Sequence, residues 1–238
     1  MTSQNDMMTY AARLHQLAAE REDDNALVFV DSTGTEQLWS WRALADRSVQ
    51  VARGLLTVGV GEGDRVGIKI RNSPDHVHVA LACYHVGAVP VPVRWDLPDW
   101  ELERILGVLD AKLVVEPGHA CLTATADEST DPLPDAMSPN ASGVMSSGST
   151  GSPKIILRLV PGMYIPGASS NRLIEAYGEL GDQLVLVPAP LYHSNGFMAL
   201  GNLLSGDRLL LLERFDTSVL LAAIERHGVT GMVATTVM

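Results

Sequence analysis

Hydroxyl groups, glycines and one lysine crowd into nine consecutive residues at positions 146–154. The segment reads Ser-Ser-Gly-Ser-Thr-Gly-Ser-Pro-Lys and follows a short apolar stretch. Gly148 and Gly151 allow the backbone to adopt positive φ and bring its N–H groups close to an anion. The neutral donors are Ser146, Ser147, Ser149 and Thr150, and Lys154 adds a full positive charge. This combination predicts a loop that binds phosphate.

Lys154 is expected to extend from a strand and not from the first turn of a helix. Pro153 has a fixed φ and disfavours the helical region for the residue before it. Gly143 and Gly148 have the spacing of a Walker A loop, but Ser149 stands where that loop needs its lysine. The sequence therefore argues against a P-loop NTPase. The alternative to a phosphate site is a flexible surface turn, which is the usual role of a segment rich in Ser, Gly and Pro.

The order of residues 146–154 resembles the phosphate-loop signature of the adenylate-forming superfamily. This superfamily comprises acyl-CoA synthetases, luciferases and the adenylation domains of peptide synthetases. A second segment, Pro190-Leu-Tyr-His193-Ser-Asn-Gly196, resembles the family's Pro-x-x-His-x-x-Gly motif and lies a few dozen residues downstream. The upstream half is also similar, at Trp41-Arg-Ala-Leu-Ala and Asp64-Arg-Val-Gly-Ile.

The resemblance implies an α/β fold, the N-terminal part of the large domain of an adenylate-forming synthetase. In the implied reaction, a carboxylate attacks the α-phosphate of ATP and releases pyrophosphate, and the thiol of coenzyme A then displaces AMP. The implied cofactors are ATP, Mg²⁺ and coenzyme A, and the substrate is a small-molecule carboxylic acid. A carrier-protein thiol stays open as the acceptor in place of coenzyme A.

The resemblance also implies roles for individual residues. The phosphate-binding residues are Ser146, Ser147, Gly148, Ser149, Thr150 and Gly151, with Thr150 as the Mg²⁺ ligand. Lys154 would supply a mobile positive charge to the phosphates during catalysis. His193 would lie beside the acyl carboxylate and the α-phosphate, with Asn195 and Gly196 next to it. A structural role would be the default for a lone histidine after a strand, and the flanking motif residues favour the site.

Several segments of the superfamily are missing from this sequence, among them Tyr-Gly-x-Thr-Glu, Ser-Thr-Gly-Asp and the domain that carries the adenylation lysine. We therefore expect the chain to correspond to roughly the N-terminal half of a synthetase and to be inactive by itself. The run Pro153-Lys-Ile-Ile-Leu-Arg, with Arg94-Trp-Asp-Leu-Pro, is similar to bacterial ligases for bile acids and other bulky acids. Two alternatives stay open: a non-catalytic nucleotide-binding remnant, and the adenylation half of a peptide synthetase.

Composition narrows the class of protein. The 238 residues are 46% hydrophobic, and 17 basic against 28 acidic side chains give a net charge of −11. This charge argues against nucleic-acid or anionic-membrane partners, because it repels phosphate polymers. Cys83 and Cys121 fit neither a disulfide framework nor a metal motif, and no apolar run reaches the roughly 18 residues of a membrane span. We expect a cytoplasmic protein without membrane insertion. A homodimer is one arrangement that the resemblance suggests.

Strand-like and helix-like patterns of apolar residues alternate along the chain, which predicts layered sheets with helices on both faces. Strands are expected at 26–30, 37–41, 65–70, 89–93, 112–116, 183–187, 208–212 and 232–235. Helices are expected at 41–58, 74–87, 99–110, 170–178, 196–204 and 218–227. A hairpin is expected to flank the phosphate loop. The segment 123–140 is polar and rich in Pro, so we predict a first subdomain at 1–122, an exposed linker at 123–140 and a second subdomain at 141–238. Five histidines lack the spacing of metal ligands, namely His76, His78, His85, His119 and His227.

Overall fold

The computed structural model describes residues 7–146, 154–166, 183–232 and 234. The predicted helix at 170–178 lies outside these residues. The larger of two main sheets has the strand order β12-β10-β11-β2-β3. Its strands are β2 (Asn25–Val30), β3 (Glu36–Ser40), β10 (Leu184–Val187), β11 (Arg208–Leu212) and β12 (Gly231–Met232). All neighbours are parallel except β2 and β3, which form the expected hairpin.

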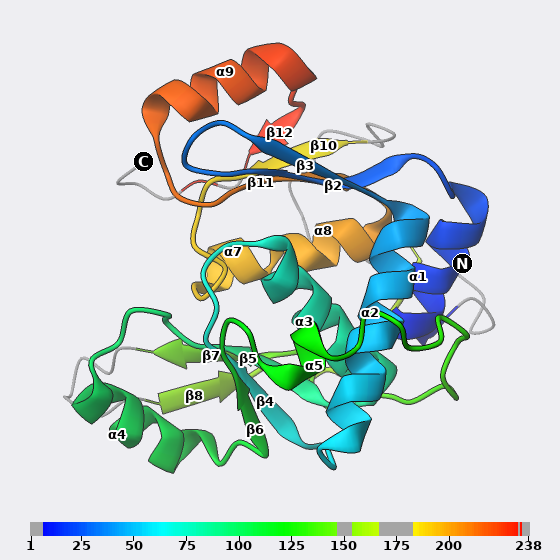
Figure 1. The fold of residues 1–238 in the computed structure, drawn as a ribbon, viewed down its shortest axis with the longest axis vertical. Coiled ribbons are helices and arrows are strands. Elements are labelled where there is room, and N and C mark those ends of the chain that lie inside the picture. The colour runs from blue at the N-terminus through cyan, green and yellow to red at the C-terminus, as the bar shows by residue number, and fades with distance from the viewer. Residues whose placement is uncertain (1–6, 147–153, 167–182, 233, 235–238) are drawn as a thin grey trace.

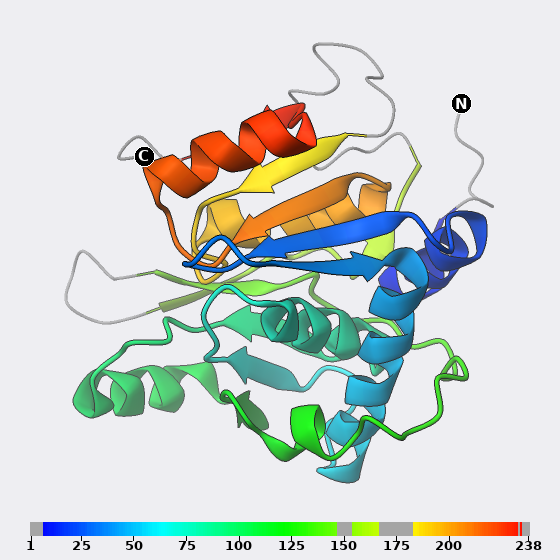
Figure 2. The same cartoon turned by 45° about the horizontal axis from the view of Figure 1, so that its top comes forward.

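Side-chain alternation decides which helices cover this larger sheet. Val28 and Val30 face one side and pack with Leu220 of α9 (Thr217–His227). Leu27 and Phe29 face the other side and join the main core, which also contains α1 (Tyr10–Glu20), α2 (Trp41–Thr57) and α8 (Ala199–Ser205). Successive residues of a strand point to opposite faces, so both faces of the sheet are buried. Figure 2 shows α9 over the outer face of this sheet.

A second, three-stranded parallel sheet has the order β5-β4-β6, with β4 (Arg65–Ile68), β5 (Val89–Pro92) and β6 (Leu113–Val115). One face packs on α3 (Pro74–His85) and the other on α4 (Asp99–Leu109). Gly67 leaves room for α4, because a Cβ there would lie only 3.1 Å from the Leu109 side chain. The two prolines of β5 suit its position at the end of the strand order.

The helix α3 lies between the two sheets together with α8 (Figure 1). Every residue of α3 except Asp75 is buried, as expected of a helix that packs on all sides. Ser73 caps its N-terminus and Pro74 occupies the first turn, where the missing N–H costs nothing. The α/β fold with helices on both faces of the sheets is therefore confirmed.

The polar segment before the phosphate loop runs along α2. Arg53 donates hydrogen bonds to the carbonyl oxygens of Ser129 and Asp131, at 2.8 Å each. Gln50 donates in the same way to Ala126 and Glu128. A short helix, α5 (Ala120–Thr123), begins this stretch. Strands from both sides of 123–140 share the larger sheet, and the predicted division into subdomains stays a prediction.

The buried histidines and both cysteines among the described residues are structural in character. His76 and His78 are fully buried, and both cysteines are buried free thiols. Ser48 donates to the Ala45 carbonyl oxygen and accepts from His85 Nε2 at 2.9 Å. The described part of the chain contains no cluster of three or more His, Cys, Asp or Glu side chains that could hold a metal ion. None of its helices combines the length and apolarity needed to cross a bilayer.

Candidate functional site

An antiparallel hairpin carries the ends of the predicted phosphate loop. Its strands are β7 (Gly143–Ser146) and β8 (Lys154–Leu157), and Ser146 is the partner of Lys154 across the pair. Met145, Ile155 and Leu157 pack against the core beneath α4. The opposite face carries Ser146 and Lys154, because alternate residues of a strand point to opposite sides. The Lys154 side chain is exposed.

The hairpin and the extended conformation at Lys154 were both expected from the sequence, and both are confirmed. The turn itself, with Ser147, Gly148, Ser149, Thr150 and Gly151, lies outside the described residues. Their contacts with phosphate or Mg²⁺ therefore stay a prediction.

The second motif lies directly after a buried strand of the larger sheet. All four residues of β10 are buried, and the chain continues through a turn in which His193 N donates to Pro190 O at 3.0 Å. His193 O then accepts from Phe197 N at 2.9 Å, so His193 opens the short helix α7 (Ser194–Phe197). The His193 and Asn195 side chains are exposed at the carboxyl end of a parallel strand. Open α/β folds bind their ligands at such ends.

Gly196 has a steric reason to be glycine. A Cβ at this position would lie 2.2 Å from Pro190 O and 2.7 Å from the carbonyl carbon of the same residue. Because carbonyl groups cannot move aside as a flexible side chain can, any larger residue would displace the turn. The fixed spacing between Pro190 and Gly196 in the motif thus follows from this close contact.

Asn72 anchors the same turn, and sequence analysis missed it. Its Nδ2 donates to Ala189 O at 3.0 Å and to Leu212 O at 2.9 Å. Its Oδ1 accepts from Leu191 N at 2.7 Å. The buried amide therefore ties the segment after β10 to the end of β11. The only signal in the sequence was a polar residue soon after a buried strand, which by itself does not identify partners more than a hundred residues away.

The electrostatic surroundings favour a neutral imidazole at His193. Partial burial of the ring and, secondarily, the positive charge of Arg94 lower the pKa of His193 below its ordinary value. Arg94 is held by Asp96 through two hydrogen bonds of 2.6 and 3.1 Å. A neutral imidazole has one N–H donor and one acceptor nitrogen, so His193 can hydrogen-bond an anion without supplying a charge.

A cavity of about 340 Å³ lies at the same edge of the sheet, lined by Tyr192 and by side chains that follow β4, β5 and β11. The Arg71 guanidinium stands 4.2 Å from the centre of the Trp95 ring and donates to Glu213 at 2.8 Å. The pairing with Glu213 and the stack on Trp95 together fix Arg71 at this edge.

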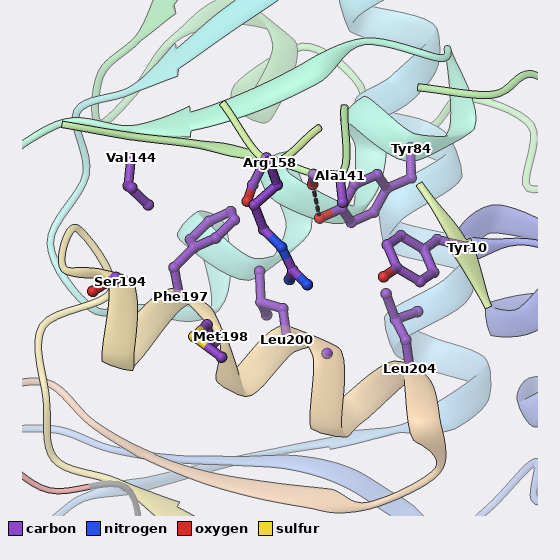
Figure 3. Close-up of a pocket in the computed structure, with 12 residues that line it drawn as sticks. Tyr10, Tyr84, Ala141, Val144, Arg158, Ser194, Phe197, Met198, Leu200 and Leu204 are labelled. Carbon is purple, nitrogen blue, oxygen red and sulfur yellow. Dashed lines mark hydrogen bonds between the residues drawn. The ribbon is translucent and has the colours of Figure 1, made fainter. Parts of the chain in front are cut away.

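A second cavity, of about 260 Å³, joins the elements that carry the two motifs. We call it the Arg158 cavity. Val144 and Arg158 line it from the hairpin side, and Ser194 and Phe197 line it from α7. Figure 3 shows these side chains around one space, with Leu200 and Leu204 of α8 below. The structure therefore brings parts of the Lys154 hairpin and of the His193 turn to the same cavity, which Lys154 and His193 themselves do not line.

Comparison with known sequences finds relatives along most of the chain. The family described as AMP-binding enzyme matches residues 14–238. Feruloyl-CoA synthase from an Amycolatopsis species is 31% identical over 210 residues, which are 80% of this chain and 42% of that protein. The 2-succinylbenzoate–CoA ligase of Bacillus pumilus is 26% identical, over 86% of this chain and 44% of the ligase. Pyochelin synthetase PchE of Pseudomonas aeruginosa is 27% identical over 90% of this chain and 15% of its own length.

Solved structures show the same fold. The O-succinylbenzoate coenzyme A synthetase of Bacillus subtilis, solved with AMP, superimposes with a TM-score of 0.77 at 21% identity, over 98% of this chain and 63% of that chain. The N-terminal subdomain of NpsA from Klebsiella oxytoca gives 0.75 at 23% identity, over 94% of this chain and 59% of that one. The chain thus spans less than half the length of the curated CoA ligases reported above. The resemblance to the adenylate-forming enzymes is confirmed, and the chain belongs to the AMP-binding enzyme family.

Proposed function

We propose that this chain forms the phosphate-binding and acyl-binding part of an ATP-dependent carboxylic acid:CoA ligase. The whole reaction would proceed in two steps. A carboxylate oxygen bonds to the α-phosphorus of ATP as pyrophosphate leaves, and the thiol sulfur of coenzyme A then bonds to the acyl carbon as AMP leaves. The observation that supports this proposal is the Arg158 cavity, because Val144 of the Lys154 hairpin and Ser194 next to His193 both line it.

Lys154 is proposed to act as a charge for the phosphates. It is the first residue of β8 and follows the Ser/Gly-rich segment in the sequence, and its side chain is exposed. The chain has a net charge of −11, so a nucleotide has to be captured by local positive charge. Ser146, its partner across the hairpin, is half-buried and contributes a hydroxyl at the same end.

His193, with Asn195 and Gly196, is proposed to form the acyl and adenylate side of the site. The lowered pKa of His193 keeps its imidazole neutral at pH 7, so it would orient an oxygen by donating one hydrogen bond. Gly196 and Asn72 would hold the backbone of the turn in place for that contact. Positioning of this kind contributes to rate by keeping the reacting groups aligned.

Mg²⁺ is proposed to enter with the phosphates of ATP. The described residues offer no carboxylate cluster for it. Mg²⁺ usually keeps several waters and binds through substrate phosphates and one or two protein oxygens. The Thr150 hydroxyl is the protein ligand that the sequence proposes. Bound there, the ion would neutralise part of the charge that develops on the phosphate oxygens.

The acceptor thiol and the class of acid are separate parts of the proposal. The CoA-ligase relatives support coenzyme A, and the match to pyochelin synthetase supports a carrier-protein thiol as the second candidate. The bulky-acid assignment rests on the similarity at residues 94–98 and 153–158. Cytoplasmic location and a homodimer stay predictions.

Lysine footprinting tests the phosphate site directly, because the sequence has only three lysines: Lys69, Lys112 and Lys154. Acylation of the chain with an amine-reactive reagent, with and without Mg·ATP, would be read out by peptide mass spectrometry. We expect ATP to protect Lys154 and to leave the exposed Lys112 unchanged. Equal labelling of Lys154 in both samples, or protection of both lysines alike, would contradict the proposal.

A further inference from the structure

The Arg158 cavity has an apolar wall and is also lined by the guanidinium of Arg158, which is an exposed residue. Phe197, Met198 and Leu200 form one side, and the rings of Tyr10 and Tyr84 meet edge to face with centres 4.9 Å apart on the other. In Figure 3 the guanidinium of Arg158 points into the space between Phe197 and Tyr10. A charged group that projects into an apolar space suits an oppositely charged ligand.

The fold does not need the Arg158 side chain. The backbone of this residue is fixed, since its N donates to Ser142 O and its O accepts from Asn140 Nδ2, both at 2.9 Å. In the described part of the chain, the guanidinium itself has neither an ion-pair partner nor a hydrogen bond. Its planar fork of N–H groups is therefore available to bind a carboxylate through two parallel hydrogen bonds.

The two tyrosines differ in whether their hydroxyls are already used. Tyr84 donates to Ala141 O at 2.8 Å, whereas the Tyr10 hydroxyl makes no hydrogen bond within the residues that the structure describes. Burial raises the pKa of Tyr10, so this hydroxyl stays protonated at neutral pH and can donate. Arg158 and Tyr10 thus offer a guanidinium and a hydroxyl donor, which together match one carboxylate. The hydroxyls of Ser142 and Ser194 also line the cavity.

The position of Arg158 along the hairpin sets the length of such a ligand. Lys154 and Arg158 lie four residues apart on one continuous segment, which corresponds to about 13 Å at about 3.3 Å per residue. Val144 of the same hairpin and Ser194, the neighbour of His193, line the cavity at its other end from Tyr10. A ligand with one carboxylate at the proposed site near Lys154 and His193 and a second group on Arg158 would therefore have an elongated body. The walls at Phe197, Met198 and Tyr10 require this body to be apolar.

We propose that the acid bound by this chain is an elongated dicarboxylate with an aromatic or alicyclic body, and that its second carboxylate binds to Arg158 and Tyr10. This inference rests on the proposed function, because the first carboxylate is the one to be activated. Arg158 would then determine specificity without taking part in the chemical step.

Calorimetric titration of the 238-residue chain without ATP tests the proposal. The probes are a biphenyl dicarboxylate, its monomethyl ester and the biphenyl monocarboxylate. We expect the dicarboxylate to bind about tenfold or more tightly than either comparison compound, because a hydrogen-bonded charge pair contributes at least that factor. Arg158→Gln should remove the difference, and Arg158→Lys should restore part of it.

Arg214→Gln is the matched control, since Arg214 lines the other cavity and the substitution removes the same charge. It should leave the preference for the dicarboxylate unchanged. The proposal is overturned by equal affinity for the three probes, by no binding, by a preference that survives in Arg158→Gln, or by loss of the preference in Arg214→Gln. Equal binding of the monomethyl ester and the dicarboxylate would show that the second carboxylate is not required and would also overturn it. Footprinting of Lys154 by ATP is independent of this result, so the phosphate site and the Arg158 site can fail separately.

Discussion

The His193 turn and the Lys154 hairpin are held in different ways. The turn is fixed through its backbone, by the contact of Gly196 with Pro190 O and by the three hydrogen bonds of Asn72. The hairpin is fixed through Met145, Ile155 and Leu157 on its inner face, while Lys154 is exposed and makes no side-chain hydrogen bond within the described residues.

This difference separates residues that the fold requires from residues that only a ligand requires. Substitutions in the turn should lower the free energy of unfolding, because they remove packing or leave buried polar groups unpaired. Substitution of Lys154 should leave the free energy of unfolding unchanged and affect only ligand binding.

Gly196→Ala should have the largest effect. The added methyl group would lie 2.2 Å from Pro190 O, and relief of that contact should cost about 3 kcal/mol of unfolding free energy. Urea denaturation monitored by circular dichroism measures this loss. Gly61→Ala is the control, because a Cβ at Gly61 meets nothing within 4 Å and should change stability by less than about 0.5 kcal/mol. Equal stability of the two variants would show that the turn can yield without cost.

Asn72→Ala should follow, with a loss of about 2 kcal/mol, because it leaves the buried N–H of Leu191 and the carbonyls of Ala189 and Leu212 without their partner. Asn140→Ala is a matched control that removes one exposed hydrogen bond, to Arg158 O. It should cost less than about 0.5 kcal/mol. If the two asparagine variants unfold at the same urea concentration, Asn72 does not anchor the turn.

Sequence reasoning recovered the features that depend on neighbouring residues. The hairpin around the phosphate loop and the helix after Ser40 follow from local alternation and capping, and both are confirmed. Asn72 and Arg158 were not found as site residues, because their surroundings come from distant parts of the chain. Asn72 acts on residues 117 to 140 positions away, and the Arg158 cavity is built from segments as far apart as Tyr10 and Leu204. No local pattern encodes such contacts.

The histidines also divide into buried residues of the fold, such as His76 and His85, and the partly exposed His193 of the proposed site. His76 lies in α3 behind the turn, with its ring centre 6.2 Å from that of Phe197, and its Nδ1 donates to Ile70 O. Burial lowers the pKa of His76 to about 4 and that of His85 to about 3, whereas His193 is partly exposed. In an NMR titration from pH 8 downward, we expect His193 to titrate before His76 and His85.

The free energy of unfolding should decrease as the pH falls, because His76 and His85 are buried in their neutral form. Their folded pKa values lie below the unfolded value of about 6.5, so the unfolded chain binds more protons in the range between them. Their contribution is complete above about pH 6.5 and is lost progressively as the pH falls toward 4 and then 3. Urea midpoints measured between pH 7 and pH 4 check this decline. Unchanged midpoints would contradict the buried, neutral state of both rings.

Lys154 is expected to bind the phosphates of the ligand and not to stabilise the fold. The decisive measurement is the affinity of the chain for Mg·ATP in wild type, Lys154→Ala and Lys112→Ala, with the urea midpoint of each variant recorded alongside. We predict that Lys154→Ala weakens ATP binding about tenfold or more, as expected for loss of a charge-assisted hydrogen bond, while its urea midpoint and the affinity of Lys112→Ala stay at the wild-type values. Wild-type ATP affinity in Lys154→Ala, or a loss that is matched by Lys112→Ala, would contradict the account.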